Sequence, residues 1–455
     1  MGSNTVQTED RAWRHDVLRP SLPEIHSTLP IPESPAFLRK LIAFGGPGFL
    51  VAVGYMDPGN WATDLAAGSR FNYELLFVIM LSNMMAMLLQ SLCVKLGVAT
   101  GRDLAQACRD AYSAPVSFFL WVLCEIAIAA CDLAEIIGSA IAINLLTGGR
   151  IPLLWGVVLT VFDVLLLLLL QQRGFRYIEA LVISLIGVIG ICFGLEILFS
   201  HPDIYGIAGG FLVPSPKVIR DPAALYIAIG ILGATVMPHN LYLHSAVVQS
   251  RRFERTPAGK REAIKYCQID STVALTVALL VNAAILIVSA ATFYSNGHRE
   301  VAEITDAYKL LTPLLGVTGA STIFALALLA SGQNSTLTGT LAGQVVMEGF
   351  LNIRLKPWVR RLITRLVAVV PAIIVTALYK EHGITKLIIF SQVVLSMQLS
   401  FAVFPLVIFT NDKRKMGEFA NGPVMKVLAW VVAVGIAIVN IWLLIQATRG
   451  GEIFR

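Results

Sequence analysis

Apolar runs of about twenty residues or more alternate with short polar stretches along most of the chain. A helix rises about 1.5 Å per residue, so about twenty apolar residues cross the hydrocarbon core of a bilayer. The pattern predicts an all-α integral membrane protein with eleven spans, at 41–70, 74–99, 115–147, 152–171, 177–199, 222–250, 263–292, 318–351, 357–378, 384–409 and 423–447.

The first and sixth spans are both interrupted by a proline within a similar motif. The interruptions read Asp57-Pro58-Gly59-Asn60 and Met237-Pro238-His239-Asn240. Proline lacks a backbone donor and clashes with the preceding turn, so each helix must unwind there. Unwound backbone at membrane depth is tolerated where it is buried in protein or lines a watery cavity. Paired breaks of this kind indicate the substrate site of a secondary transporter.

Ten of the spans divide into two sets of five, each of which opens with a broken helix. Because five is odd, the second set lies upside down relative to the first. This predicts a LeuT-type 5+5 inverted repeat, with the first repeat at 41–199, the second at 200–410 and a peripheral eleventh helix within 411–455. The tail 1–40 mixes charges with prolines and is expected to be cytoplasmic and disordered.

The composition is typical of a membrane protein, and the placement of the charges argues against nucleic-acid binding. Apolar residues make up 56% of the chain, charged residues 14%, and the mean hydropathy is +0.73. With the N-terminus inside, 25 of the 35 Lys and Arg residues fall on inner loops and helix ends. The net charge of +6 therefore reports topology, with the N-terminus cytoplasmic and the C-terminus outside. Short outer loops favour a bacterial inner membrane.

The six cysteines are scattered and form no CxxC pair. Metal-site thiols were the alternative, but free structural thiols in membrane helices are the expectation.

The first break offers oxygen donors suited to a cation. Asp57 brings a carboxylate, Asn60 an amide oxygen one turn later, and the open turn frees the carbonyl of Gly54. A buried charge at this depth normally has a partner and faces a cavity. The alternative role for Asp57 is a cap on the downstream half-helix.

The second break offers a sulfur donor in the equivalent place. Met237 precedes its proline as Asp57 does, and a thioether favours transition metals over Mg²⁺ or Ca²⁺. The freed carbonyl of Ala234 would face the same cavity. Simple packing is the common role of a membrane methionine.

Other buried polar residues predict a route for protons. His239 lies within the second break, where it either titrates or is hydrogen-bonded structurally. Glu125, Asp132 and Glu135 share one face of the third span and suggest a relay, with a static salt-bridged network as the alternative.

Three polar residues of the second half complete the candidate set. Arg360 and Arg361 lie at the start of the ninth span. They are either counter-charges for the acidic relay or anchors of the helix at the inner membrane surface. Gln392 on the tenth span either lines the pathway or joins helices.

With these motifs the sequence resembles the Nramp family of proton-coupled divalent metal transporters. The resemblance covers about 44–409 and is carried by Met56-Asp57-Pro58-Gly59-Asn60, Ala234-Thr235-Val236-Met237-Pro238-His239, Cys131-Asp132-Leu133-Ala134-Glu135 and, more weakly, Gly339-Thr340-Leu341-Ala342-Gly343-Gln344.

The resemblance implies a metal site and a proton route. The metal ligands are Asp57, Asn60, Met237 and the carbonyls of Ala234 and Gly54, and Gln392 closes the site. The proton route runs from Asp57 with His239 or with Glu135 and Asp132 toward Arg360 and Arg361.

The function we expect is import of Mn²⁺, Fe²⁺ or related ions such as Cd²⁺ together with protons, by alternating access. The partners are then the metal ion, protons and the lipid bilayer, with no resident cofactor, no nucleic acid and no required protein partner. A Mg²⁺ transporter on the same fold is the nearest alternative. The sequence lacks the spacing of metal ligands and base that a membrane metalloenzyme needs. Asp57 would repel the carboxylate of an amino acid, which argues against an amino-acid symporter. A metal sensor that does not transport would be recognised by the absence of metal flux.

Overall fold

The computed structural model describes residues 20–32, 36–160, 174–299, 303–353 and 384–448, with a few positions between 359 and 374. The described chain is almost entirely helical. Its only sheet in the described part is a short parallel pair, β1 (Leu29–Pro30) and β2 (Arg251–Arg252). The expected all-α architecture is confirmed.

The helices of the first half begin at one end of the molecule and cross it repeatedly. They are α2 (Phe37–Phe44), α3 (Pro47–Ala52), the 3₁₀ turn η1 (Val53–Met56), α4 (Pro58–Phe71), α5 (Leu76–Thr100), α6 (Leu104–Ala111), α7 (Ala114–Leu146) and α9 (Phe175–Ser200).

The second half repeats the broken-helix opening. It comprises α10 (Ile204–Leu212), α11 (Lys217–Arg220), α12 (Pro222–Thr235), α13 (Pro238–Val247), η2 (Val248–Ser250), α14 (Pro257–Ser289), the π-helical turn η3 (Ala290–Tyr294), α15 (Ile304–Leu315), α16 (Ala320–Leu351), α18 (Ile384–Asn411), α19 (Lys413–Met416), η4 (Gly417–Phe419) and α20 (Pro423–Thr448).

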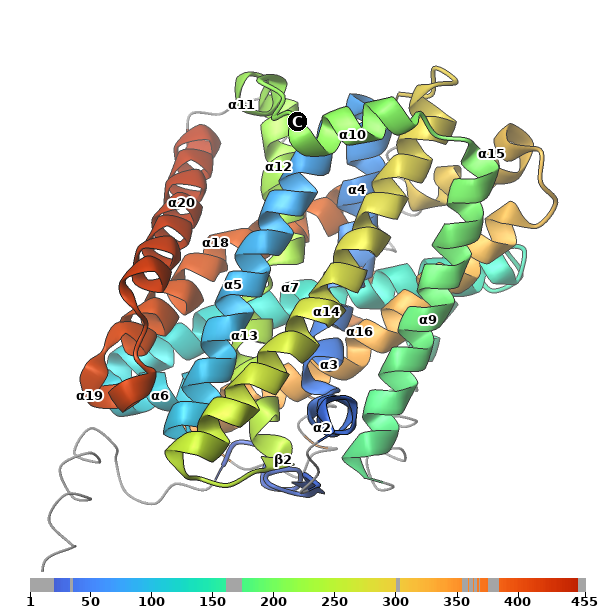
Figure 1. The fold of residues 1–455 in the computed structure, drawn as a ribbon. Helices are drawn as coiled ribbons and strands as arrows, with labels where there is room; N and C mark the ends of the chain where they lie inside the picture. The colour runs from blue at the N-terminus through green and yellow to red at the C-terminus, as the bar shows by residue number, and fades with distance from the viewer. Residues whose placement is uncertain are drawn as a thin grey trace, which may run out of the picture.

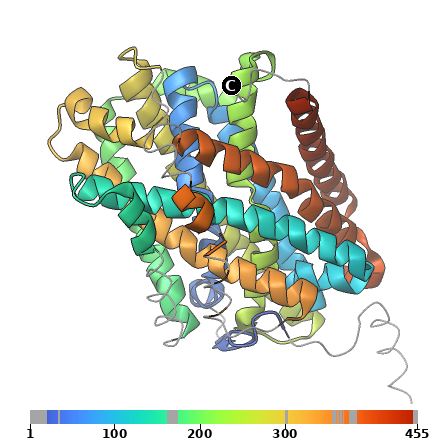
Figure 2. The same ribbon diagram turned by 180° about the vertical axis from the view of Figure 1, so that it is seen from behind.

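Two groups of long helices enclose the broken ones. In Figure 1, α5, α14 and α9 stand in front, with α20 at the edge. Figure 2 shows α7, α16 and α18 crossing obliquely on the opposite side. Both breaks therefore lie in the middle of the bundle, where Tyr55, Trp61 and Tyr242 are fully buried.

Seven helices in the described ranges are long and apolar enough to span a membrane, or eight if the bent α2 and α3–η1 pair is one span. The predicted bounds agree closely for the third span (115–147 against Ala114–Leu146) and the tenth (384–409 against Ile384–Asn411). The predicted fourth and ninth spans fall largely outside the described residues, so the total of eleven stays a prediction. The 32-residue α16 occupies the predicted eighth span.

The segment 20–32 differs from the expected disordered tail. The Leu22 and Ile25 side chains are buried in the main core, and the Ser27 N–H donates to the Gln249 carbonyl at 2.9 Å. Ser21 donates to Asp103 at 2.5 Å. The prediction of disorder is therefore wrong for residues 20–32, while residues 1–19 lie outside the described part.

Candidate metal site

The first break is a proline-started helix with an aspartate cap. Asp57 has extended backbone and accepts the Asn60 N–H at 2.8 Å, and Pro58 occupies the first position of α4, where its missing donor costs nothing. The expected capping role of Asp57 is thus present. Its second oxygen, Oδ2, remains directed away from this cap.

The second break has the same form without a side-chain cap. Helix α12 ends at Thr235, Met237 stands at the cap position and Pro238 begins α13. Met237 is fully buried, and its side chain accepts no hydrogen bond from α13. Its thioether is therefore held at the break without a capping function.

The two breaks meet at the side chain of Asn60. Its Nδ2 lies 3.2 Å from the Gly54 carbonyl oxygen, 2.7 Å from Asp57 Oδ1 and 3.1 Å from the Ala234 carbonyl oxygen. Three oxygens from both halves of the chain thus converge on one donor. Such a convergence of hard oxygens suits a cation equally well.

Gly54 allows the second break to approach this point closely. A Cβ atom at Gly54 would lie 2.2 Å from Asn240 Nδ2 and 3.3 Å from Met237 Sδ. The Met237 sulfur is therefore beside the converging oxygens. Both polar side-chain atoms of the buried Asn240 lack a hydrogen-bond partner in the described part of the chain.

Gln392 on α18 lies against the first break. A Cβ atom at Gly59 would fall 2.1 Å from Gln392 Nε2, so the amide packs directly on the backbone of the break. This nitrogen donates to Ser391 at 3.0 Å, and Oε1 has no partner among the described residues. All six predicted metal-site residues are thus at or beside the breaks.

A thiol links the first break to the predicted acidic face of α7. Cys131 Sγ lies 3.8 Å from Asp57 Oδ2 and 3.5 Å from Glu135 Oε1. Ser335 on α16 donates to the same Glu135 oxygen at 2.6 Å. Asp132 is close as well, since a Cβ atom on Gly339 would lie 3.0 Å from Asp132 Oδ1 and 3.4 Å from Glu135 Oε1.

The third acid, Glu125, is separate from this group. It lies ten residues before Glu135 on α7, about 15 Å along the helix axis. Its carboxylate accepts the Trp121 indole N–H at 3.0 Å, and the residue is half-buried. The structure brings together two of the three predicted relay acids.

The two histidines of α13 differ in their surroundings. His239 is buried, and its Nδ1 has no hydrogen-bond partner among the described residues. His244 Nδ1 lies 2.9 Å from Gln90 Oε1, and Gln90 in turn donates to the Tyr55 hydroxyl. His244 therefore belongs to a hydrogen-bonded chain with Gln90 and Tyr55, whereas His239 has one ring nitrogen without a partner among the described residues.

The site is electronegative. Neither Lys nor Arg is ion-paired with Asp57 in the described ranges. Within those ranges no three His, Cys, Asp or Glu side chains form a metal cluster, so the site relies on one carboxylate and neutral donors. The predicted counter-charges Arg360 and Arg361 lie outside the described residues.

Sequence reasoning missed two residues of the site. Cys131 was expected to be a structural thiol, and all six cysteines are indeed free and buried. Its position one turn before Glu135 was the available signal. Asn240 follows Pro238 as Asn60 follows Pro58, and this repeat was the signal for its role beside Gly54.

Comparison with known proteins identifies relatives over almost the whole chain. The profile of the family described as natural resistance-associated macrophage protein-like matches residues 48–446. A divalent metal cation transporter, MntH, of Listeria innocua is 61% identical over 444 residues, covering 98% of each chain. The protein of the same name from a Nostoc species is 64% identical, covering 95% of this chain and 97% of its own.

Solved structures agree. A crystal structure of the Eremococcus coleocola manganese transporter superposes with a TM-score of 0.86 and 42% identity, covering 92% of this chain and 90% of its own. A nucleobase-cation-symport-1 family transporter in a closed conformation matches with a TM-score of 0.60 at 13% identity, covering 90% and 94%. The latter match shows a shared LeuT-type fold.

Proposed function

Because this chain belongs to the natural resistance-associated macrophage protein (Nramp) family, we propose that its two helix breaks bind the divalent metal ion that it transports. Divalent metal ion transport follows from the relatives at 57–64% identity, and the chain is a multi-pass membrane protein, not an enzyme. The assignment of ligands is our proposal.

The observation that carries it is the convergence on Asn60. The Gly54 and Ala234 carbonyls and the Asp57 carboxylate surround one amide nitrogen within 3.2 Å. When the cation binds, Nδ2 leaves the three oxygens and the Asn60 side chain turns so that its amide oxygen faces the ion. Asn60 then presents Oδ1 to the ion, and the three converging oxygens remain as ligands.

The Met237 sulfur beside Gly54 adds the soft ligand. Hard cations gain little from a thioether, whereas Mn²⁺, Fe²⁺ and Cd²⁺ accept it. We infer that the ion is Mn²⁺ or Fe²⁺. A relative of solved structure is a manganese transporter, which supports the first. The same sulfur argues against the alternative of a Mg²⁺ carrier.

Proton coupling is proposed to use the carboxylates beside the metal site. A divalent cation that binds Asp57 displaces a proton from its carboxyl group. Cys131 Sγ lies within 3.8 Å of both Asp57 and Glu135, so the proton can pass to Glu135 by way of this thiol. His239, with its free nitrogen, is a second acceptor. Metal and proton then enter together as the two repeats rock about the site.

For orientation we propose a cytoplasmic N-terminus and an external C-terminus in a bacterial inner membrane. The excess of Lys and Arg on one set of loops supports this arrangement. The bacterial relatives support the choice of membrane.

The decisive variant is Asp57→Asn, because asparagine caps a helix as well as aspartate does but carries no charge. We expect folded protein whose Mn²⁺ affinity and uptake fall about thirtyfold or more. Uptake is measured in proteoliposomes, and binding by isothermal calorimetry.

The matched control is Asp221→Asn, which changes the half-buried aspartate cap of α12 in the same way. It should leave uptake unchanged. Normal Mn²⁺ binding by Asp57→Asn would show that Asp57 is only a cap, and the proposed site would be wrong.

A further inference from the structure

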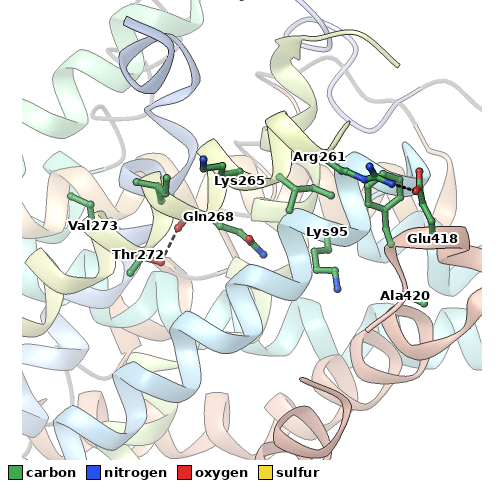
Figure 3. A pocket seen from close by; sticks show the side chains of 11 residues that line it. Lys95, Arg261, Lys265, Gln268, Thr272, Val273, Glu418 and Ala420 are labelled. Carbon is green, nitrogen blue, oxygen red and sulfur yellow. Dashed lines mark hydrogen bonds and ion pairs between the residues drawn. The ribbon is translucent and has the colours of Figure 1, made fainter. Parts of the chain in front are cut away.

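A groove on the surface of the helix bundle shares no lining residue with the metal site. It has a volume of about 690 Å³ and lies where α5, α14 and η4 meet. Figure 3 shows its lining, with the Arg261–Glu418 ion pair at one end and Val273 at the other.

The groove is cationic. Three basic side chains, Lys95, Arg261 and Lys265, line it together with one acid, Glu418, which pairs with Arg261. Among the described residues neither lysine has an acidic partner. Lys95 Nζ donates to the neutral amide oxygen of Asn421 at 2.6 Å, and Lys265 is exposed. Two positive charges are thus left for an anion.

Polarity changes in order along the α14 side of the groove. Charged Arg261 and Lys265 come first, then Gln268 and Thr272, and then Val273, which is 48% exposed. Two turns farther on, the same helix face shows Leu280 at 63% exposure. The apolar end is continuous with the outer surface of a membrane-spanning helix.

We propose that this groove binds one anionic phospholipid. Lys95 and Lys265 hold the phosphate, Gln268 and Thr272 face the glycerol and ester region, and an acyl chain lies along Val273 and Leu280. Basic pockets between membrane helices select acidic headgroups in this way. A soluble phosphate would leave the apolar end unused, so the sequence of polarities favours the lipid.

The groove lies at the end of the bundle that also holds the N-terminal segment, since Lys40 near the chain start pairs with Glu262 on α14. In the orientation proposed above, that end faces the cytoplasmic leaflet. The groove contains none of the proposed metal ligands, so lipid binding there is independent of metal binding.

The test is native mass spectrometry of the full-length protein in detergent. Phosphatidylglycerol and phosphatidylcholine with identical acyl chains are titrated separately, and the affinity of the first bound lipid is compared. The wild type should prefer phosphatidylglycerol. Lys265→Gln should lower the affinity for phosphatidylglycerol about fivefold, which is the loss expected for one basic residue at the membrane surface. Its affinity for phosphatidylcholine should be unchanged.

Two further variants complete the design. Lys265→Arg keeps the charge and should retain the lipid. Lys426→Gln removes an exposed lysine at the start of α20 that does not line the groove, and it should have no effect. Each variant is checked by its melting temperature. Lys265 is the better position to replace because its side chain is exposed, whereas Lys95 donates a hydrogen bond to Asn421 that contributes to folding.

Several outcomes would overturn the proposal. Unchanged phosphatidylglycerol affinity in Lys265→Gln would exclude the groove, and an equal loss in Lys426→Gln would reduce the effect to general surface charge. Displacement of the lipid by millimolar inorganic phosphate would identify a site for soluble anions instead.

Discussion

Asp57 accepts contacts from two helices, and this arrangement lets one residue shape the break and also bind an ion as we propose. Asn60 on α4 occupies its Oδ1, and the Cys131 thiol on α7 approaches its Oδ2. The capping oxygen fixes the carboxylate in place. The other oxygen is left with a weak donor that a cation or a proton can replace.

A Glu135 variant tests the proposed proton movement separately from metal binding. Glu135→Gln keeps a group that accepts the Ser335 hydrogen bond but cannot titrate. Because no metal ligand is lost, we expect Mn²⁺ affinity to change by less than about tenfold while proton influx per metal ion falls strongly. An internal pH dye and Mn²⁺ uptake, read in the same proteoliposomes, measure both.

Glu125→Gln on the same helix serves as the comparison. Glu125 lies about three turns from Glu135 and accepts a hydrogen bond from Trp121 instead. It should affect proton influx less than Glu135→Gln does. A large loss of Mn²⁺ affinity in Glu135→Gln with unchanged proton influx would make Glu135 a ligand rather than a proton carrier.

Asp103, at the start of α6, gives a pH dependence outside the membrane spans. Burial raises its pKa from 3.8 to about 6, although Ser21 and the N–H of Gln106 donate to it. A raised carboxyl pKa means that the folded state holds the proton more tightly than the unfolded state. Stability from this group is therefore lost as pH rises from about 4 to about 6, by roughly 3 kcal/mol at most.

We expect Asp103→Asn, which keeps the cap, to gain stability relative to the wild type as pH rises from 4 to 7. Melting temperatures of both proteins across that range measure the difference. A difference that is constant with pH would contradict the raised pKa.

At the scale of elements, the segment 20–32 ties several helices together at one end of the bundle. It pairs with β2 through Leu29 and Pro30, and the adjacent Arg251 is buried against Glu179 of α9 at 2.8 Å. Arg251 also donates to the carbonyls of Phe44 and Gly45. In the alternating-access cycle that we propose, this end of the bundle opens to release the ion.

A cross-link across this pair tests whether it opens. Pro30 and Arg252 are direct partners in the β1–β2 register and both are exposed. The double variant Pro30→Cys/Arg252→Cys should lose Mn²⁺ uptake on oxidation and regain it on reduction. Each single variant is the control and should transport under both conditions. Equal uptake by the oxidised and reduced double variant would mean that this contact persists throughout transport.

The elements predicted best from the sequence were those with uninterrupted apolar runs. The predicted third span agrees with α7 within one residue at each end. Its residues face either lipid or core, and few polar residues interrupt the apolar run near its ends. The breaks were equally clear, because proline dictates them locally. The packing of residues 20–32 was not predictable: two apolar side chains, Leu22 and Ile25, anchor a segment otherwise rich in polar residues and proline.

At the scale of the whole molecule, the equivalence of the two breaks predicted that Asp57 and Met237 would face one another across a shared space. The Asn60 contacts to Gly54 and Ala234 show that the two breaks lie together, and the shared role of Asp57 and Met237 stays a prediction. The bridging role of Cys131 depends on how α7 lies against α4. That is a tertiary property which no local pattern in the chain specifies.

The two halves also contribute unequal chemistry, an oxygen-rich break from the first and a sulfur-bearing break from the second. This asymmetry is the basis of metal selection in our account. A site built from oxygen alone would favour the abundant hard ions, and the thioether works by penalising them.

The most direct test of this central claim is competition uptake of Cd²⁺, Mn²⁺ and Ca²⁺ by Met237→Ala in proteoliposomes. Replacing the sulfur leaves room for water, which hard cations accept. Met56→Ala is the control, because it truncates a buried methionine next to the first break and creates a similar cavity. Our account predicts that Met237→Ala keeps some Mn²⁺ uptake, loses preference for Cd²⁺ and gains Ca²⁺ uptake, whereas Met56→Ala keeps the wild-type ranking. An unchanged metal ranking in Met237→Ala would contradict it and show that the sulfur only packs.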